Sequence, residues 1–297
     1  MEEPELTARN VQTKHLQVGR LRVEIYPNGR SAGVAAASAA AASLKELEET
    51  QKTIGVIFAT GASQLDTLDA LTKIQGLPWH RVRGFHMDEY LGIPTDHPAS
   101  FRRYLRERLT EKVSLKEFFE IDGNAAKPEQ VCREYADRLR AAKPHLCLLG
   151  IGENGHLAFN DPPFADFADP LDAKVVHLDS ICRQQQAAEG WFPNLDDVPK
   201  SAITLTIPTL LRVPKLIVSV PGSRKAKIVR RTLEDPISTD CPATVLRTHP
   251  DARLFLDTES ASELNRLLSA EKNEELALDA PDAMKIGSAQ EGREPGL

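Results

Sequence analysis

Apolar positions along the chain follow two alternating patterns. Short runs rich in β-branched residues predict strands at residues 53–60, 81–87, 118–122, 145–151, 174–178, 202–207, 215–220 and 252–256. Between most of them apolar residues recur at helical spacing, which predicts helices over residues 31–47, 64–74, 98–109, 129–142 and 223–233. This alternation is typical of an α/β fold whose mostly parallel sheet is covered by helices on both faces.

Length and composition fit one large core. The chain has 297 residues, of which 41% are hydrophobic and 27% are charged, as in ordinary globular proteins. No linker interrupts the alternating pattern, so we predict a single domain over residues 1–270. Residues 271–297 lose the periodicity and collect Glu, Asp, Gly and Pro, a composition that cannot repay the entropy of ordering. We expect this C-terminal tail to be disordered.

The charge of the chain restricts its partners. A net charge of -6 and a pI near 5.8 argue against nucleic acid as the main partner, because neutralising phosphates requires a basic face. A small anionic ligand needs only a few local donors. The N-terminal residues are acidic, and no apolar run approaches the roughly 18–20 residues that span a bilayer. We therefore expect a cytoplasmic protein with no membrane partner.

The cysteines indicate neither a metal cluster nor disulfides. They are widely scattered and include no Cys-x-x-Cys pair. Their positions are Cys132, Cys147, Cys182 and Cys241. We expect a reducing compartment and no structural metal.

Two turns between a predicted strand and a predicted helix are candidate anion sites. In the first, Thr60, Gly61, Ala62 and Ser63 let backbone N–H groups and a hydroxyl approach an anion at a helix N-terminus. In the second, Lys225 lies near a helix N-terminus, an unfavourable place for a cation unless an anion binds there. The alternatives are a tight turn with a helix cap in the first case and a solvated lysine in the second.

Two adjacent carboxylates, Asp88 and Glu89, end the strand predicted at residues 81–87. Neighbouring residues at a strand end point in different directions, so one can enter a crevice while the other binds the surrounding loops. Either could be a general base, and the alternative is a solvated acidic turn.

The loop after residue 149 has glycines in a dinucleotide-binding pattern. Gly150, Gly152 and Gly155 are spaced Gly-x-Gly-x-x-Gly, but that pattern should open the first βαβ unit and continue into a helix. Here it lies deep in the chain, and the prolines at 162 and 163 stop a helix. A loop folded around a small substrate fits better, with His156 between polar partners that fix its tautomer.

Together these segments resemble the glucosamine-6-phosphate deaminase family. The resemblance covers roughly residues 20–260, and its specific parts are the Asp-Glu-Tyr segment and the loop at residues 150–162. Weaker matches are His97, Pro98, Ser100 and residues 60–63, 198–200, 222–226 and 248–250. The resemblance implies a Rossmann-like three-layer α/β/α fold and conversion of glucosamine 6-phosphate and water to fructose 6-phosphate and ammonia. It implies no metal or organic cofactor.

The resemblance also implies roles for individual residues. Asp88 would be the base that moves a proton between C2 and C1 of the opened sugar. His156 would handle the proton of the ring oxygen during ring opening, with Asn154 and Asp161 as its orienting neighbours. The phosphate would be held by Lys225 and by residues 60–63, and the backbone at Gly150 would border the substrate.

Three departures from the family put the substrate in question. The family often has Asp where Asn154 stands, and Glu where Asp161 stands, so the shorter Asp161 is expected to need a backbone shift to reach the same atom. An Arg that grips phosphate in relatives is replaced by Glu189 and Gly190. Our hypothesis is that Arg183 compensates from a nearby position.

Three other functions stay open at this point. A deaminase or isomerase for another amino-sugar phosphate, such as galactosamine 6-phosphate, fits the altered segment at residues 189–190. A 6-phosphogluconolactonase shares the fold and a similar loop, although its relatives usually have Arg where Tyr90 stands. A non-catalytic sugar-phosphate sensor is the third, because fold does not fix function. The sequence allows a homo-oligomer but does not determine the assembly.

Overall fold

The structure, a computed structural model, describes residues 13–162, 164–188 and 190–264. The described residues up to Glu263 belong to one compact unit. The expected domain boundary at residue 270 and the expected disordered tail, residues 271–297, lie outside the described residues. No helix in the described part of the chain combines the length and the apolar character needed to cross a membrane.

The central sheet has the strand order β1-β2-β11-β10-β7-β3-β4-β6. Its strands are β1 (Lys14–Val18), β2 (Leu21–Tyr26), β3 (Ile54–Phe58), β4 (Val82–His86), β6 (Glu117–Phe119), β7 (Leu146–Leu149), β10 (Lys215–Val220) and β11 (Ala252–Asp257). Among these described strands, only the β1–β2 pair is antiparallel. The chain winds outward from β3 through β4 to β6, then returns to β7 and winds the other way. The switch between β3 and β7 opens a crevice at their carboxyl ends.

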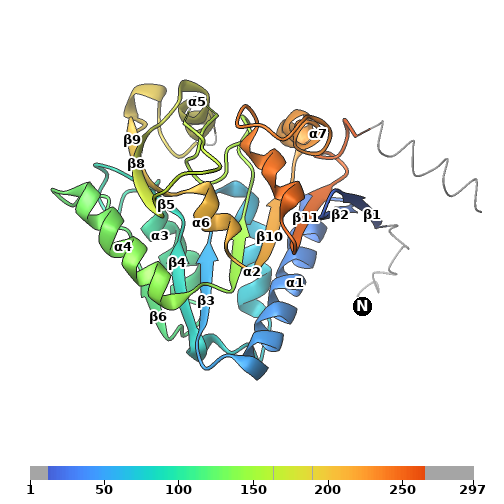
Figure 1. The fold of residues 1–297 in the computed structure, drawn as a ribbon, viewed down its shortest axis with the longest axis horizontal. Coiled ribbons are helices and arrows are strands. Elements are labelled where there is room, and N and C mark those ends of the chain that lie inside the picture. Colours follow the sequence, from blue (N-terminus) through green and yellow to red (C-terminus); the bar gives the residue numbers. More distant parts are fainter. Residues whose placement is uncertain (1–12, 163, 189, 265–297) are drawn as a thin grey trace, which may run out of the picture. The chain divides into compact units, whose positions relative to one another are not determined.

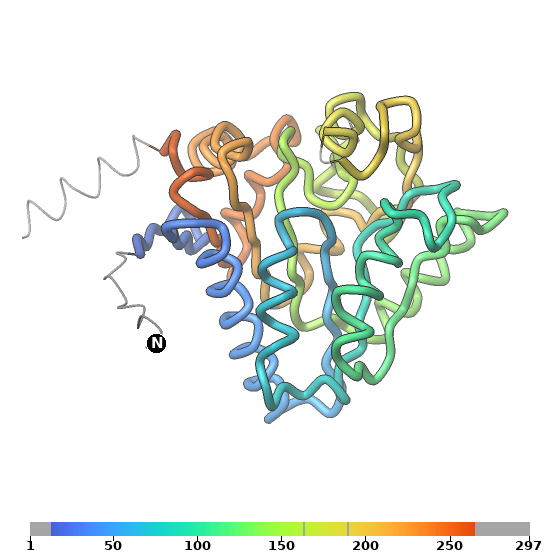
Figure 2. The backbone as a smooth tube through the Cα atoms, turned by 180° about the vertical axis from the view of Figure 1, so that it is seen from behind, coloured from blue at the N-terminus to red at the C-terminus, as the bar shows by residue number. Residues whose placement is uncertain are grey.

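Helices cover both faces of this sheet. They are α1 (Gly29–Thr50), α2 (Leu65–Lys73), α3 (Phe101–Leu105), α4 (Pro128–Ala142), α5 (Ser180–Ala188), α6 (Ile207–Leu211) and α7 (Ala226–Glu234). Figures 1 and 2 show α1 and α2 on one face and α4 and α6 on the other. The expected three-layer α/β/α fold with a mostly parallel sheet is therefore confirmed.

Small side chains let α1 lie close to its neighbours. Ala36, Ala37 and Ala40 have no exposed surface and pack with apolar residues of α2 and the sheet. A Cβ atom at Gly33 would stand 2.5 Å from Cβ of Asp66 in α2. The helix predicted over residues 31–47 is thus confirmed, and its alanines pack tightly.

A second, three-stranded antiparallel sheet was not anticipated. Its order is β5-β9-β8, from Asp88–Tyr90, Ser201–Leu205 and Ala173–His177. The segments at 174–178 and 202–207 were predicted as strands, but they leave the parallel sheet. Only Met87 separates β4 from β5, so Asp88 lies where the chain passes from one sheet to the other and pairs with Thr204.

We predict that Ala40→Leu destabilises the protein by about 1–3 kcal/mol, because a larger side chain overpacks this contact. Ala42→Leu is the matched control, since Ala42 is exposed on the same helix, and it should stay within about 0.5 kcal/mol of the parent. Urea unfolding measures both. Equal effects of the two substitutions would contradict the close packing of α1.

Candidate active site

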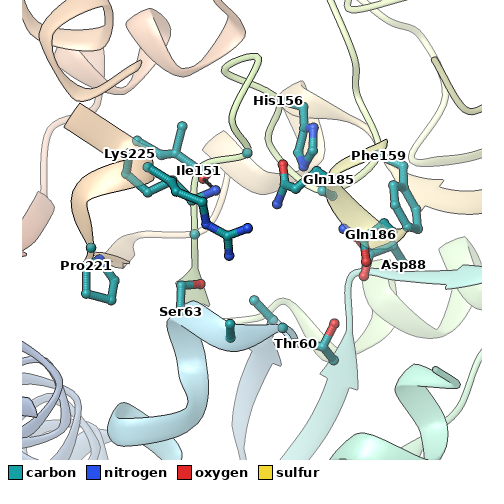
Figure 3. A pocket seen from close by; sticks show the side chains of 18 of the residues that line it. Thr60, Ser63, Asp88, Ile151, His156, Phe159, Gln185, Gln186, Pro221 and Lys225 are labelled. Atoms are coloured by element: carbon teal, nitrogen blue, oxygen red, sulfur yellow. Dashed lines mark hydrogen bonds between the residues drawn. The ribbon is translucent and has the colours of Figure 1, made fainter. Parts of the chain in front are cut away.

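The crevice holds a cavity of about 290 Å³. Its walls come from the carboxyl ends of β3, β7 and β10, from the start of β5 and from α5. Of the predicted site residues, the cavity is lined by Thr60, Gly61, Ala62, Ser63, Asp88, Gly150, His156 and Lys225. Asn154 and Asp161 do not line it and instead contact His156 from behind. In Figure 3, Lys225, Pro221 and Ser63 lie on one side of the cavity, and Asp88, His156, Gln185 and Gln186 lie on the other.

Two turns of the same construction form the first side. After β3 and after β10 the chain passes through a glycine with positive φ, Gly61 (φ 89°) or Gly222 (φ 94°), then a short 3-10 turn and a helix. A Cβ atom at either glycine would meet nothing within 4 Å. Backbone conformation, and not crowding, therefore requires glycine here. Both turns point helix N-termini at the cavity, which favours an anion.

Two cations stand at the second turn. Nζ of Lys225 donates a hydrogen bond to the carbonyl oxygen of Ile151, 2.9 Å away, which ties the turn to the glycine-rich loop. Arg224 also lines the cavity, with its Nε 3.7 Å from Oε1 of Glu153. Sequence reasoning missed Arg224, although its place next to Lys225 is a usable signal. Together they bring two cationic side chains to this side, where Glu259 also lines the cavity.

Glu89 and Asp88 have separate surroundings. Glu89 has no exposed surface; it accepts hydrogen bonds from the backbone N–H groups of Phe101 and Arg102 at the start of α3 and pairs with the Arg102 guanidinium at 3.1 Å. Asp88 faces the cavity, and its Oδ1 is buried without a hydrogen-bond partner among the described residues. Burial and the neighbouring Glu89 charge raise the pKa of Asp88 well above its usual value. Asp88 is therefore the carboxylate that can accept a proton.

The end of β4 is fixed by buried hydrogen bonds. The hydroxyl of Tyr135 accepts from the N–H of His86 at 2.9 Å and donates to its carbonyl oxygen at 2.7 Å, while Nε2 of His86 accepts from the N–H of Ile121 at 2.7 Å. Burial lowers the pKa of His86 to about 3, so it stays neutral. The backbone that leads into Asp88 is thus held in place.

His156 is positioned from behind by two polar side chains. Its Nδ1 lies 3.0 Å from Oδ1 of Asp161, and its backbone N–H donates to Oδ1 of Asn154 at 3.0 Å. The Asn154 amide also donates to Oδ1 of Asp161 at 2.9 Å. Burial acts to raise the pKa of Asp161, but the contacts with His156 and Asn154 outweigh it and hold the pKa below its usual value. The shorter Asp161 side chain does reach the imidazole.

Neighbouring protein side chains leave no room for a Cβ atom at the three glycines of this loop. An added Cβ would stand 2.7 Å from Oγ of Ser63 at Gly150 and 2.2 Å from the His156 ring at Gly152. Gly155 has φ 91°, and its Cβ would lie 2.9 Å from Sγ of Cys241. The imidazole thus packs directly on the backbone of Gly152. Gly150 and Gly152 line the cavity, whereas Gly155 packs behind it against Cys241.

Sequence reasoning missed two glutamines that α5 contributes to the cavity. Gln185 accepts a hydrogen bond from the N–H of Glu153 at 2.9 Å, and Gln186 accepts one from the hydroxyl of Tyr90 at 2.7 Å. With Oε1 occupied by Tyr90, the NH₂ group of Gln186 is the part that a ligand can use. Helix α5 was not predicted, so nothing directed these side chains to the site.

The hypothesis that Arg183 replaces the missing arginine is not supported. Its guanidinium donates to the carbonyl oxygens of Leu195 and Val198, at 2.6 and 3.1 Å, and Arg183 does not line the cavity. These bonds close the loop after α5. Glu189 lies outside the described residues, and Gly190 has φ 81°, a conformation that favours glycine.

A cavity with an anion-binding side and a carboxylate and imidazole on the other, at the switch of a doubly wound sheet, defines an α/β enzyme for a small anionic substrate. The chain belongs to the family described as glucosamine-6-phosphate isomerases/6-phosphogluconolactonase, whose sequence profile matches residues 28–255.

Individual relatives agree with this membership. The chain is 37% identical to a glucosamine-6-phosphate deaminase of Exiguobacterium sibiricum over 208 residues, 70% of this chain and 80% of that protein. For a deaminase of Listeria monocytogenes the identity is 35%, over 69% of this chain and 85% of the relative. A solved monomeric glucosamine-6-phosphate deaminase superposes with a TM-score of 0.74 and 31% identity, over 81% of this chain and 99% of that chain.

A lactonase is similar in fold alone. The 6-phosphogluconolactonase of Thermotoga maritima superposes with a TM-score of 0.65 at 21% identity, over 79% of this chain and 98% of that one.

We predict opposite stability effects for the two adjacent carboxylates. Glu89→Gln should cost about 3 kcal/mol or more, because it removes the buried carboxylate that pairs with Arg102, and the exposed Asp122, 3.3 Å from the guanidinium, is a weaker counter-ion. Asp88→Asn should stabilise the protein above neutral pH. Since the pKa of Asp88 is raised in the folded state, its ionised form costs stability as pH rises through that pKa. The difference in stability between Asp88→Asn and the parent protein should vanish at acidic pH. Urea unfolding across pH tests both, and a destabilised Asp88→Asn at alkaline pH would contradict this assignment.

Proposed function

We propose that the protein converts glucosamine 6-phosphate and water to fructose 6-phosphate and ammonia. One observation carries the proposal: Oδ1 of Asp88, which has no hydrogen-bond partner among the described residues, belongs to a carboxylate that faces a cavity whose other side offers two helix N-termini and two cations. A sugar with phosphate at one end would place its C1 and C2 at Asp88. Isomerisation needs one carboxylate over two adjacent carbons, and the raised pKa of Asp88 brings its proton affinity nearer to the working range of a general base.

His156 fits the proton transfer that opens the sugar ring. An imidazole can both give and take a proton near neutral pH. Its contact with Asp161 and its packing on Gly152 fix the ring plane, so the imidazole needs little reorganisation when a sugar binds. Asn154 and Asp161 then act as positioning residues.

The phosphate end supplies binding energy away from the reacting carbons. Residues 60–63 offer backbone donors, and Arg224 and Lys225 offer charge. Phosphate held there positions C1 and C2 at a fixed distance. Arg224 thereby takes the part that the family assigns to an arginine near residue 190.

Gln186 and Tyr90 favour an amino-sugar phosphate over a lactone. The Tyr90 hydroxyl orients the Gln186 amide, whose NH₂ group can donate to a sugar hydroxyl. An arginine at position 90, which the lactonase family usually has, could donate to Oε1 of Gln186 but would replace the aromatic ring that packs on Phe159 and Phe192. Tyr90 therefore supports the deaminase.

The purified protein should release ammonia and fructose 6-phosphate from glucosamine 6-phosphate. Asp88→Asn should lower kcat by about 100-fold or more, because it removes the base. A parallel assay with galactosamine 6-phosphate tests which epimer of the amino-sugar phosphate is the substrate. The proposal fails if neither sugar yields ammonia, and the role of Asp88 fails if Asp88→Asn stays fully active while folded.

Arg224→Ala should raise KM for the sugar phosphate about fivefold with kcat little changed. The Arg224 side chain is 56% exposed, so we expect about 1 kcal/mol, below the range for a buried charged hydrogen bond. Arg183→Ala is the matched control and should leave KM unchanged. A raised KM in Arg183→Ala together with an unchanged KM in Arg224→Ala would instead assign the phosphate contact to Arg183.

A further inference from the structure

Three side chains that can bind a metal ion meet behind the cavity. Nδ1 of His156, a carboxylate oxygen of Asp161 and Sγ of Cys182 lie within 4.8 Å of one another. Asp161 and Cys182 have no exposed surface, and of the three only His156 lines the cavity. Imidazole, carboxylate and thiolate are the ligands that zinc takes in proteins, and three of them leave a fourth position for water.

The geometry of this triad is close to that of metal ligands. Nδ1 of His156 is 3.0 Å from Oδ1 of Asp161, yet it is buried without an aligned hydrogen bond among the described residues. Nitrogen and oxygen atoms each about 2.0–2.1 Å from a tetrahedral zinc ion are about 3.3 Å apart. The two atoms therefore need to separate by only about 0.3 Å to hold a zinc ion between them.

The charges around the triad favour a cation. The Asn154 amide bridges the carboxylate of Asp161 in the triad and that of Asp179 beside it. The partners that hold Asp161 are an amide, a backbone N–H and the imidazole of His156, none of which is a permanent cation. A divalent ion would neutralise these carboxylates, and coordination deprotonates a thiol outright.

We propose that Zn²⁺ binds between His156, Asp161 and Cys182 and inhibits the protein reversibly. On binding, the thiol of Cys182 releases its proton to solvent and a sulfur–zinc bond forms. The ion takes the lone pair of Nδ1, and the imidazole proton then resides on Nε2. With one ring nitrogen bound to the ion and the other protonated, His156 has no lone pair left to accept a proton from a substrate. This last step rests on the proposed function, whereas the binding itself does not.

Cobalt provides a test that needs no substrate. Co²⁺ bound to a thiolate gives an intense charge-transfer absorption in the near ultraviolet, so the full-length protein is titrated with Co²⁺ alone. One equivalent should produce the band in the parent and in Cys241→Ala, a matched buried-cysteine control, but not in Cys182→Ala. Zn²⁺ should displace the cobalt and remove the band. Cys182→Ser, followed by circular dichroism, replaces Cys182→Ala if the alanine variant does not fold.

Ammonia release gives the second readout. Zn²⁺ should lower the rate of the parent about 100-fold, a chelator should restore it, and Cys182→Ala should stay active in Zn²⁺. A band that persists in Cys182→Ala, or that is lost in Cys241→Ala, would overturn the site. A cobalt band that depends on Cys182 in a protein releasing no ammonia would support the metal site and reject the proposed function.

Discussion

The buried ion pair between Glu89 and Arg102 is the interaction on which the site depends. Without this ion pair, either of the two adjacent carboxylates at the strand end could turn toward the cavity. Arg102 and the first N–H groups of α3 bind Glu89, which fixes the turn from β4 into β5 and leaves only Asp88 at the cavity. The charge of Glu89, held nearby, also helps to raise the pKa of Asp88. One structural contact thus both places the reactive carboxylate and adjusts its proton affinity.

The switch in the winding of the sheet gives the cavity its two unlike ends. Turns after β3 and β10 bring helix N-termini to one side, whereas the second sheet and α5 build the other. The parallel sheet is common to the whole fold. The antiparallel sheet and α5 carry Asp88, Gln185 and Gln186, so the part of the chain that departs from regular winding supplies much of the chemistry.

Most of the sheet and the anion-binding turns could be predicted from sequence, because apolar runs, glycines and helix starts are local signals. The second sheet could not, since β5 is only three residues long and its pairing with β9 joins residues far apart. Helix α5 was missed for a similar reason, and with it Gln186, whose orientation depends on the Tyr90 hydroxyl. Arg183 shows the opposite error: its sequence position suggested a phosphate contact, but the loop carbonyls at residues 195 and 198 bind its guanidinium.

The packing of His156 on Gly152 has a consequence for how such sequences are compared. In a dinucleotide site the glycines make room for a ligand's pyrophosphate; here they make room for Ser63, the imidazole and Cys241. The same glycine spacing therefore has two unrelated steric causes. A Gly-x-Gly-x-x-Gly string becomes informative only once the atom that excludes each side chain is known, and in this loop every such atom belongs to the protein itself.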